Sequence, residues 1–183
     1  FDRSSPLPTG GFLEQADGTG WMALFSQNML QIALELAHYD QGYEEVAVRF
    51  VEHFLRIAAA MDRIGNVKDE MWDEEDGFFY DLLRLPDGQA TRLKVRSMVG
   101  LLPLCASTVF EADAATRYPK LMELIAQFRV RHPELVAQVA PTDAGFVGYK
   151  GRRLLSILNR SKLERVLGYL LDESEFLGPH GIR

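Results

Sequence analysis

The sequence predicts an all-α fold made of helical pairs, with one β-hairpin inserted among them. Apolar residues recur at helical spacing through most of the long segments. Residues 77–95 break that period with strand-forming residues on either side of a turn signal. No sequence repeat at a fixed period is visible, so a solenoid array is not expected.

The first two predicted helices differ in their polarity. Residues 20–38 are apolar on more than one face, which is typical of a helix buried on most sides. After a short turn at 39–42, residues 43–62 repeat the helical pattern, but one side of this helix carries charged residues that would face solvent. A buried helix followed by an amphipathic one is the pairing that a double ring of helices requires.

The rest of the chain predicts the hairpin and further helices. Strands are expected at 77–85 and 91–95, joined by the turn Pro86-Asp87-Gly88. Helices are expected at 99–110 and 114–129, with a short one at 152–158. A capping box at 161–164, with Ser161 and Glu164, starts the last helix. About six helices result.

The composition of the chain indicates which kinds of binding partner to expect. The 183 residues suit one domain, and the net charge of -6 comes without a Lys/Arg-rich stripe, so nucleic acid is not an expected partner. A neutral polar substrate fits better. Cys105 lies in the apolar run 99–106 and is predicted to be a core thiol. That run is far shorter than the ~20 residues that span a bilayer. We therefore expect no membrane partner and a cytoplasmic location.

The run from Glu14 to Met22 places carboxylates, two glycines and Trp21 where a loop becomes a long apolar helix. Aromatic faces beside carboxylates suit sugar binding, because a ring can stack on a pyranose while a carboxylate protonates or orients its oxygens. Glycine also lets a substrate approach the backbone closely. The alternative is an ordinary N-cap, in which Asp17 or Thr19 accepts the first free N–H groups of the helix.

Glycoside hydrolysis needs one carboxylic acid and a second carboxylate. Asp17, at the mouth of the helix, is the candidate general acid, and Glu14 is the runner-up. A helix N-terminus lowers the pKa of a carboxyl group, so an acid there requires burial or a neighbouring carboxylate to keep its proton.

A second acidic cluster surrounds Trp72, and its default interpretation is a solvated turn leading into the hairpin. Asp73, Glu75 and Gly77 resemble part of a calcium loop, but the terminal bidentate glutamate of an EF-hand is missing. No metal and no cofactor are predicted. The four histidines show no nucleophile pattern, and the glycines form no phosphate-binding loop.

Four ordered motifs resemble glycoside hydrolase family 63. They are 17–22 (DGTGWM), 72–81 (WDEEDGFFYD), 96–104 (RSMVGLLPL) and 175–183 (EFLGPHGIR). The likeness spans essentially the whole chain and is to the bacterial branch of glucosidases related to mannosylglycerate hydrolases. It implies an (α/α)6 toroid with helices in inner and outer pairs. It also implies inverting hydrolysis of an α-glucosidic or related α-glycosidic bond.

The resemblance also implies site residues. The family carries its acid in a Ser-Gly-x-Asp run that matches 19–22 here, and Met22 cannot donate a proton, so the acid role moves to Asp17. The general base of the family is a glutamate that lies beyond a Trp-Arg-Gly-Pro stretch, and this chain does not contain that stretch. We therefore expect the isolated chain to be inactive. The predicted substrate-binding residues are Gln15, Trp21, Trp72, His180 and Arg183, for an oligosaccharide or small glycoside.

We therefore expect residues 1–183 to be a single domain that forms about half of a larger catalytic toroid. A half toroid exposes an apolar flank, which predicts a homo-oligomer. The other hypothesis is a non-catalytic helical domain that binds carbohydrate or serves as a scaffold, as Met22 suggests.

Overall fold

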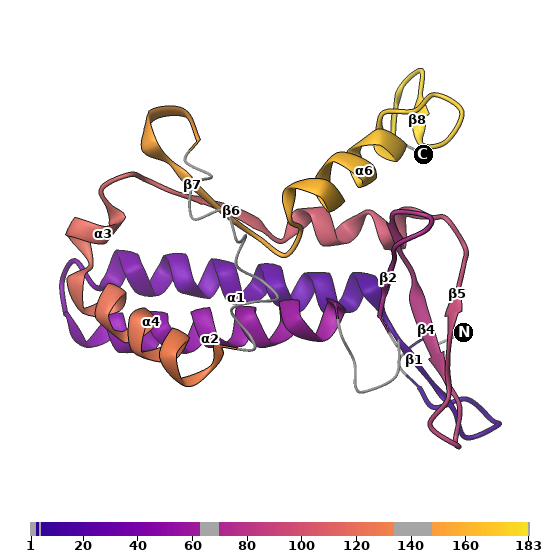
Figure 1. The fold of residues 1–183 in the computed structure, drawn as a ribbon, viewed down its shortest axis with the longest axis horizontal. Helices are drawn as coiled ribbons and strands as arrows, with labels where there is room; N and C mark the ends of the chain where they lie inside the picture. The colour runs from indigo at the N-terminus through magenta and orange to yellow at the C-terminus, as the bar shows by residue number, and fades with distance from the viewer. Residues whose placement is uncertain (1–2, 4, 63–69, 134–147, 183) are drawn as a thin grey trace. The chain divides into compact units, whose positions relative to one another are not determined.

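The computed structural model describes residues 3, 5–62, 70–133 and 148–182, and these form a mixed α/β chain (Figure 1). About 51% of the described residues are helical and 17% lie in strands, which pair in four small antiparallel sheets. The predicted all-α class is therefore wrong. The predicted partial (α/α)6 toroid is wrong with it, because that architecture uses helices alone as its framework.

The chain divides into two compact units, which we describe separately. The first unit comprises 1–20, 60–104 and 158–183, and the second comprises 21–59 and 105–157. Each unit is assembled from segments that are distant in the sequence.

A three-stranded sheet organises part of the first unit. Strand β4 (Asp81–Arg84) lies between β1 (Phe12–Glu14) and β5 (Ala90–Leu93), and all neighbours are antiparallel. Gly88 in the β4–β5 turn has a φ of 85°, a conformation that glycine adopts without strain. The hairpin predicted near 77–95 is thus confirmed, although β1 was not expected to join it.

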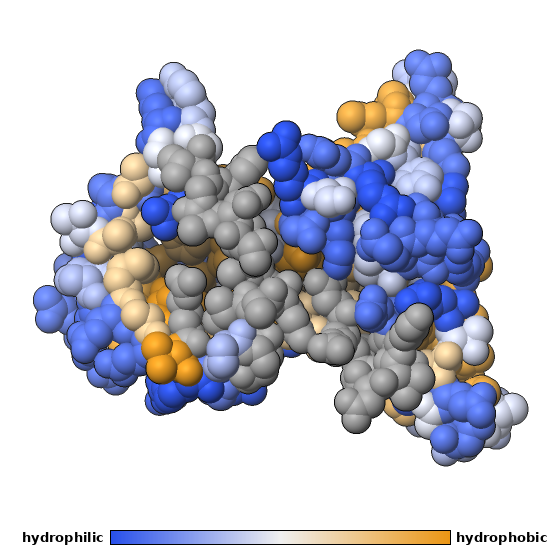
Figure 2. All heavy atoms as spheres, viewed as in Figure 1, coloured by the Kyte–Doolittle hydropathy of each residue, from blue (hydrophilic) through white to orange (hydrophobic). Residues whose placement is uncertain are grey.

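Two further strand pairs and one helix of 11 residues also belong to the first unit. Strand β2 (Trp72–Asp73) pairs with β3 (Phe78–Phe79), and β8 (Leu177–Gly178) pairs with β9 (Gly181–Ile182). Helix α6 (Arg160–Leu170) begins after Asn159, whose side chain accepts a hydrogen bond from Lys162 N at 2.9 Å. The cap is therefore Asn159 and not the predicted Ser161. Figure 2 shows a mostly hydrophilic surface over α6.

Aromatic residues fill the core of the first unit. Phe78 stacks on Phe176 at 5.9 Å between ring centroids and meets Tyr169 edge-on at 5.5 Å. The short 3-10 helix η1 (Met98–Gly100) contacts β3. Gly100 is required there, since a Cβ at this position would lie 2.2 Å from the Phe78 ring.

The second unit contains most of two long helices. Helix α1 (Ala16–Leu36) and helix α2 (Gly42–Asp62) are joined by a short turn. Helix α2 lies within one residue of its predicted range of 43–62, whereas α1 begins four residues before the predicted 20–38 and ends two residues earlier. Their buried residues repeat at helical spacing, as the core side of a helix requires. They include Ala23, Leu30, Ala33 and Leu34 on α1, and Ala47, Val51, Phe54 and Ala58 on α2.

The helix expected at 114–129 is two helices in the structure. Helix α3 (Ala114–Arg117) ends before Tyr118, and α4 (Pro119–Arg131) starts with proline at its first position. Proline disfavours helical geometry in the residue before it, and Tyr118 accordingly has a ψ of 69°. Phe128 is buried on α4.

Two other predicted helices are absent. Residues 99–110 hold parts of η1, the 3-10 helix η2 (Leu102–Cys105) and strand β6 (Ser107–Phe110). Residues 152–158 contain β7 (Arg153–Ser156), which follows η3 (Tyr149–Gly151) and pairs with β6. Pro103 is incompatible with a helix interior, and the β-branched pair Thr108-Val109 favours a strand.

Cys105 is exposed in the structure, so the predicted core thiol is wrong. The apolar run around it does not form the helix that would have buried its side chain. Within the described ranges, no helix has the combination of length and apolar character needed to cross a membrane.

Candidate functional site

The carboxylates of the first unit gather at the start of α1. Pairing of β1 with β4 puts Glu14 opposite Leu82, one residue from Asp81. The Asp81 carboxylate accepts a hydrogen bond from Ala16 N, the first helical residue, at 2.8 Å. Asp81 therefore satisfies one free N–H of the first turn, and the Asp17 carboxylate accepts another, from Gly18 N at 2.8 Å, as the N-cap alternative expected of Asp17.

Arg3 joins two of these carboxylates. Its Nη1 lies 2.7 Å from Asp17 Oδ2, and its Nη2 lies 3.0 Å from Asp17 Oδ1 and 2.7 Å from Asp81 Oδ2. The side chains of Asp17 and Asp81 are mostly buried. One guanidinium thus holds both carboxylates close together, with a bidentate contact to Asp17.

These contacts determine the charge of Asp17. Partial burial raises the pKa of Asp17, but the hydrogen bonds from Arg3 and from the backbone N–H of Gly18, with the charge of Arg3, outweigh it. The net result is a pKa below the usual value. Asp17 is therefore an ionised carboxylate in this arrangement, and removal of Arg3 would raise its pKa, because only the backbone hydrogen bonds would then oppose burial.

The neighbouring predicted residues, Glu14 and Gln15, also have hydrogen-bond partners in the structure. Glu14 accepts hydrogen bonds from Arg84 Nε at 2.6 Å and Nη2 at 3.3 Å. The backbone oxygen of Gln15 accepts bonds from the N–H and hydroxyl of Thr19. A Cβ on Gly20 would lie 3.1 Å from Pro103 Cα, so this glycine permits close packing of the chain.

Trp72 belongs to the buried core and not to an open groove. It is 2% exposed, it packs edge-on against Phe79 at 4.9 Å, and its Nε1 donates to Glu74 Oε2 at 2.6 Å. Lys162 Nζ lies 5.1 Å from the centre of the indole ring. Stacking of a sugar on this ring would require the core to open.

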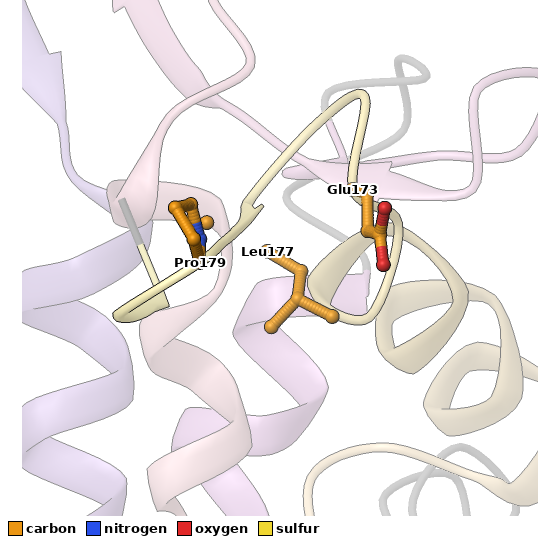
Figure 3. Close-up of a pocket in the computed structure, with 4 residues that line it drawn as sticks. Glu173, Leu177 and Pro179 are labelled. Carbon is orange, nitrogen blue, oxygen red and sulfur yellow. The ribbon is translucent and has the colours of Figure 1, made fainter.

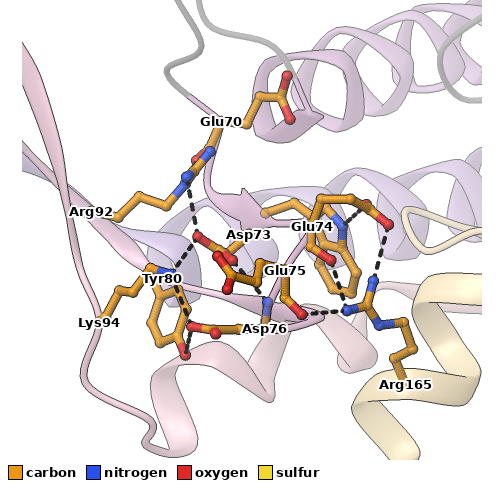
Figure 4. Close-up of polar contacts among 10 residues, drawn as sticks. Glu70, Asp73, Glu74, Glu75, Asp76, Tyr80, Arg92, Lys94 and Arg165 are labelled. Atoms are coloured by element: carbon orange, nitrogen blue, oxygen red, sulfur yellow. Dashed lines mark hydrogen bonds and ion pairs between the residues drawn. The ribbon is translucent and has the colours of Figure 1, made fainter.

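Ion pairs and hydrogen bonds hold the acidic turn around Trp72 in place (Figure 4). Asp73 is buried and contacts Lys94 Nζ at 2.9 Å and Arg92 Nη1 at 3.1 Å. Burial raises the pKa of Asp73, but the hydrogen bonds from Asp76 N and Lys94 outweigh it and lower the net value. The default interpretation, a wholly solvated turn, missed this buried carboxylate.

Arg165, on α6, closes the other side of the turn. Its Nη2 donates to the backbone oxygens of Glu74 at 2.7 Å and Glu75 at 2.9 Å, and its Nη1 contacts Glu74 Oε1 at 3.0 Å (Figure 4). Gly77 has a φ of 66°, and a Cβ there would lie 2.1 Å from Arg165 Nε. The described residues contain no group of three or more His, Cys, Asp or Glu side chains placed to hold a metal ion.

The remaining predicted residues form no hydrogen bond or ion pair with the carboxylates in the described part of the chain. Trp21 is about half exposed on α1 and is assigned to the second unit. His180 is exposed in the turn between β8 and β9. Arg183 lies outside the described residues. Beside the β8–β9 turn, Glu173, Leu177, Gly178 and Pro179 line an open hollow of about 410 Å³ (Figure 3).

Arg3 and Asp81 are the residues that the sequence analysis did not select for this cluster. Asp81 ends the motif at 72–81 and lies inside the predicted strand 77–85, so its position in a strand was visible in the sequence. Its contact with α1 depends on the pairing of β1 with β4, which no local pattern specifies. The structure therefore defines a mixed α/β chain with an arginine-bridged carboxylate cluster at a helix start.

Comparison with known proteins adds one relative. The uncharacterized protein YMR196W of Saccharomyces cerevisiae (strain ATCC 204508 / S288c) is 42% identical over 195 aligned residues. The match covers 100% of this chain and 18% of the relative, so the chain spans about a fifth of the relative's length. No family model and no solved structure matches the chain.

Proposed function

We propose that the chain forms part of an α-glycosidase that hydrolyses an α-glucosidic or related α-glycosidic bond with inversion. The observation that carries this proposal is the pair of mostly buried carboxylates, Asp17 and Asp81, joined by Arg3 at the start of α1. The likeness of four sequence motifs to glycoside hydrolase family 63 supports it. The substrate would be an oligosaccharide or a small glycoside.

The geometry suggests how Asp17 could become a proton donor. Burial and the Arg3 contact act in opposite directions on its pKa. A sugar that displaced Arg3 would remove the strongest contact that lowers the pKa of Asp17, so this pKa would rise in the direction that a general acid requires, with the backbone N–H of Gly18 still favouring the ionised form. Asp81 keeps its bond to Ala16 N and serves as a support for α1 in this scheme.

The isolated chain should be inactive, since inversion needs a second carboxylate that activates water. Glu14, the other candidate, is engaged by Arg84 and has a structural role in this proposal. The second carboxylate would lie outside the chain. A neutral substrate, no nucleic-acid partner and a cytoplasmic location remain predictions from composition.

An assay for hydrolysis tests the proposal at two lengths. The purified chain and the yeast relative would be incubated with α-linked glucosides and mannosides, and the released anomer followed by NMR. We expect no turnover by the chain and release of the inverted sugar by the relative. Turnover by the isolated chain would contradict its predicted inactivity. Absence of turnover by the relative on every substrate would contradict the glycosidase proposal.

A binding experiment tests the role of Asp17 in the chain itself. Titration with the α-glycosides, followed by NMR chemical shifts, should show binding that Asp17→Asn weakens. Glu123→Gln is the matched control, because Glu123 lies on α4 in the second unit, away from this cluster in the sequence. Equal binding by both variants would remove Asp17 from the sugar site.

A non-catalytic role is the second candidate, as a carbohydrate-binding or scaffold domain. The observation that favours it is that Arg3 and Arg84 already occupy the two candidate acids, as structural ion pairs do. Sugar binding without turnover, by both the chain and the relative, would support this alternative.

A further inference from the structure

Arg3 contacts two carboxylates through one nitrogen atom. Its Nη2 lies 3.0 Å from Asp17 Oδ1 and 2.7 Å from Asp81 Oδ2, so these two oxygens are no more than about 6 Å apart. The side chains of Asp17 and Asp81 are only 16% and 13% exposed. Two carboxylates this close and this shielded from water disfavour each other's charge unless a cation lies between them.

The backbone holds one oxygen of each carboxylate. Asp17 Oδ1 accepts a hydrogen bond from Gly18 N, and Asp81 Oδ1 accepts one from Ala16 N, both at 2.8 Å. The Oδ2 atom of each carboxylate instead contacts Arg3. Because the two backbone bonds do not involve the guanidinium, they should keep both carboxylates in place when Arg3 leaves. Displacement of Arg3 would then leave two fixed like charges side by side.

The other charged groups on the neighbouring strands have partners of their own. Glu14 on β1 and Arg84 on β4 contact each other at 2.6 Å. Arg92 on β5 and Lys94, which follows this strand, contact Asp73 at 3.1 and 2.9 Å. Among the described residues, the bridging guanidinium is therefore the cation in contact with both carboxylates at the start of α1.

We propose that Asp17 and Asp81 hold one proton between them once a substrate has displaced Arg3, so that Asp81 is the positioning residue that lets Asp17 donate a proton. This inference rests on the proposed function, which supplies the displacing substrate. The proton comes from solvent and replaces the positive charge that leaves with Arg3. Asp81 would thus be the neighbouring carboxylate that an acid at a helix N-terminus requires, in addition to its contact with Ala16 N.

Carboxyl-carbon NMR of the chain over a pH series tests this pair without any sugar. In Arg3→Met, which removes the cation, Asp17 and Asp81 should both titrate in two steps, because interacting carboxylates release their protons as a pair. The upper step should lie at a higher pH than in the unmodified chain. Adding Asp81→Asn should leave a single Asp17 step at lower pH, since asparagine can still accept from Ala16 N but carries no charge. A residue that only supports α1 would not move this step.

Asp87→Asn in the Arg3→Met background is the matched control, because it removes the same charge from the exposed hairpin turn and should leave the Asp17 titration unchanged. A single Asp17 step in Arg3→Met, or the same titration with and without Asp81→Asn, would overturn the proposal. If the amide spectrum shows that Arg3→Met is unfolded, Arg3→Gln replaces it, with the same downward shift expected on adding Asp81→Asn.

These titrations separate this inference from the proposed function. A shared proton in the chain, together with no turnover by the yeast relative, would count against the glycosidase proposal alone. Turnover by the relative, together with an Asp17 titration that ignores Asp81, would count against the carboxylate pair alone.

Discussion

The carboxylate of Glu44, on α2, accepts a hydrogen bond at 2.7 Å from the backbone N–H of Leu121, the third residue of α4. Tyr118, at the N-cap position of α4, makes no capping bond with its side chain. A residue from another helix therefore satisfies one of the free N–H groups at the start of α4. Glu44 is only 4% exposed, so this contact lies inside the second unit.

Loss of this cap should destabilise the protein. Glu44→Ala should lower the free energy of unfolding by about 1–2 kcal/mol, because a buried N–H loses its acceptor. Urea denaturation measures the change. Glu45→Ala is the control, since Glu45 forms an exposed pair with Lys120 and its loss should change the stability much less. Equal effects of the two changes would argue against the cap.

The ion pairs of Asp17 and Asp73 should make stability depend on acid pH. Both pKa values are lower in the folded protein than the usual value of 3.8. The unfolded state therefore binds more protons in this range, and stability falls as the pH drops through the folded pKa values. The stabilisation is fully present once the pH is well above 3.8.

Denaturation curves between pH 6 and pH 2 measure this dependence. Asp17→Asn and Asp73→Asn should each be less stable than the unmodified chain at pH 6 and should lose less stability on acidification. Asp87→Asn in the exposed hairpin turn provides a comparison. A pH profile that neither of the first two changes flattens would show that these pairs contribute no pH-dependent stability.

Two glycines should respond to alanine in opposite directions. Gly100→Ala should destabilise the protein by about 1–3 kcal/mol, because its Cβ would collide with the Phe78 ring and the Phe79 backbone oxygen. Gly168 lies inside α6 with nothing within 4 Å of an added Cβ, so Gly168→Ala should stabilise by about 0.5–1 kcal/mol. Thermal melts of both variants test the pair, and destabilisation by both would contradict the contacts at Gly168.

The exposed Cys105 should react without unfolding. A thiol reagent such as 5,5′-dithiobis(2-nitrobenzoate) should label the native chain, at a rate that added urea below the unfolding transition changes little. Labelling that occurs only as the chain unfolds would instead show that Cys105 is buried in the core, as the sequence predicted. Cys105→Ser confirms that the signal comes from this residue.

The sequence was most informative where the pattern was long or the turn chemistry specific. Helices α1 and α2 follow from more than five turns of apolar spacing, and the β4–β5 hairpin follows from Pro86-Asp87-Gly88. Strands β6 and β7 were mistaken for helices because each is four residues long and is stabilised by its partner. Short apolar runs do not distinguish a strand from a helix.

The candidate site was predictable only in part. Glu14, Gln15 and Asp17 were selected because they share one loop, and the structure keeps them at the start of α1. Their partners Arg3, Asp81 and Arg84 come from segments that only tertiary pairing brings near. For Trp72, the aromatic run with Phe78 and Phe79 allowed either a groove that contacts sugar or core packing as the default, and the structure has the core packing.

The contact between Gly77 and Arg165 couples the acidic turn to a helix far along the sequence. Because the guanidinium occupies the volume where any other residue would carry its Cβ, position 77 tolerates only glycine while Arg165 stays in place. The φ of 66° at position 77 also favours glycine, so losing Arg165 would not by itself free this position. A side chain at position 77 therefore requires both a different backbone turn and the loss of the Arg165 contact, although 87 other residues separate the two positions in the chain.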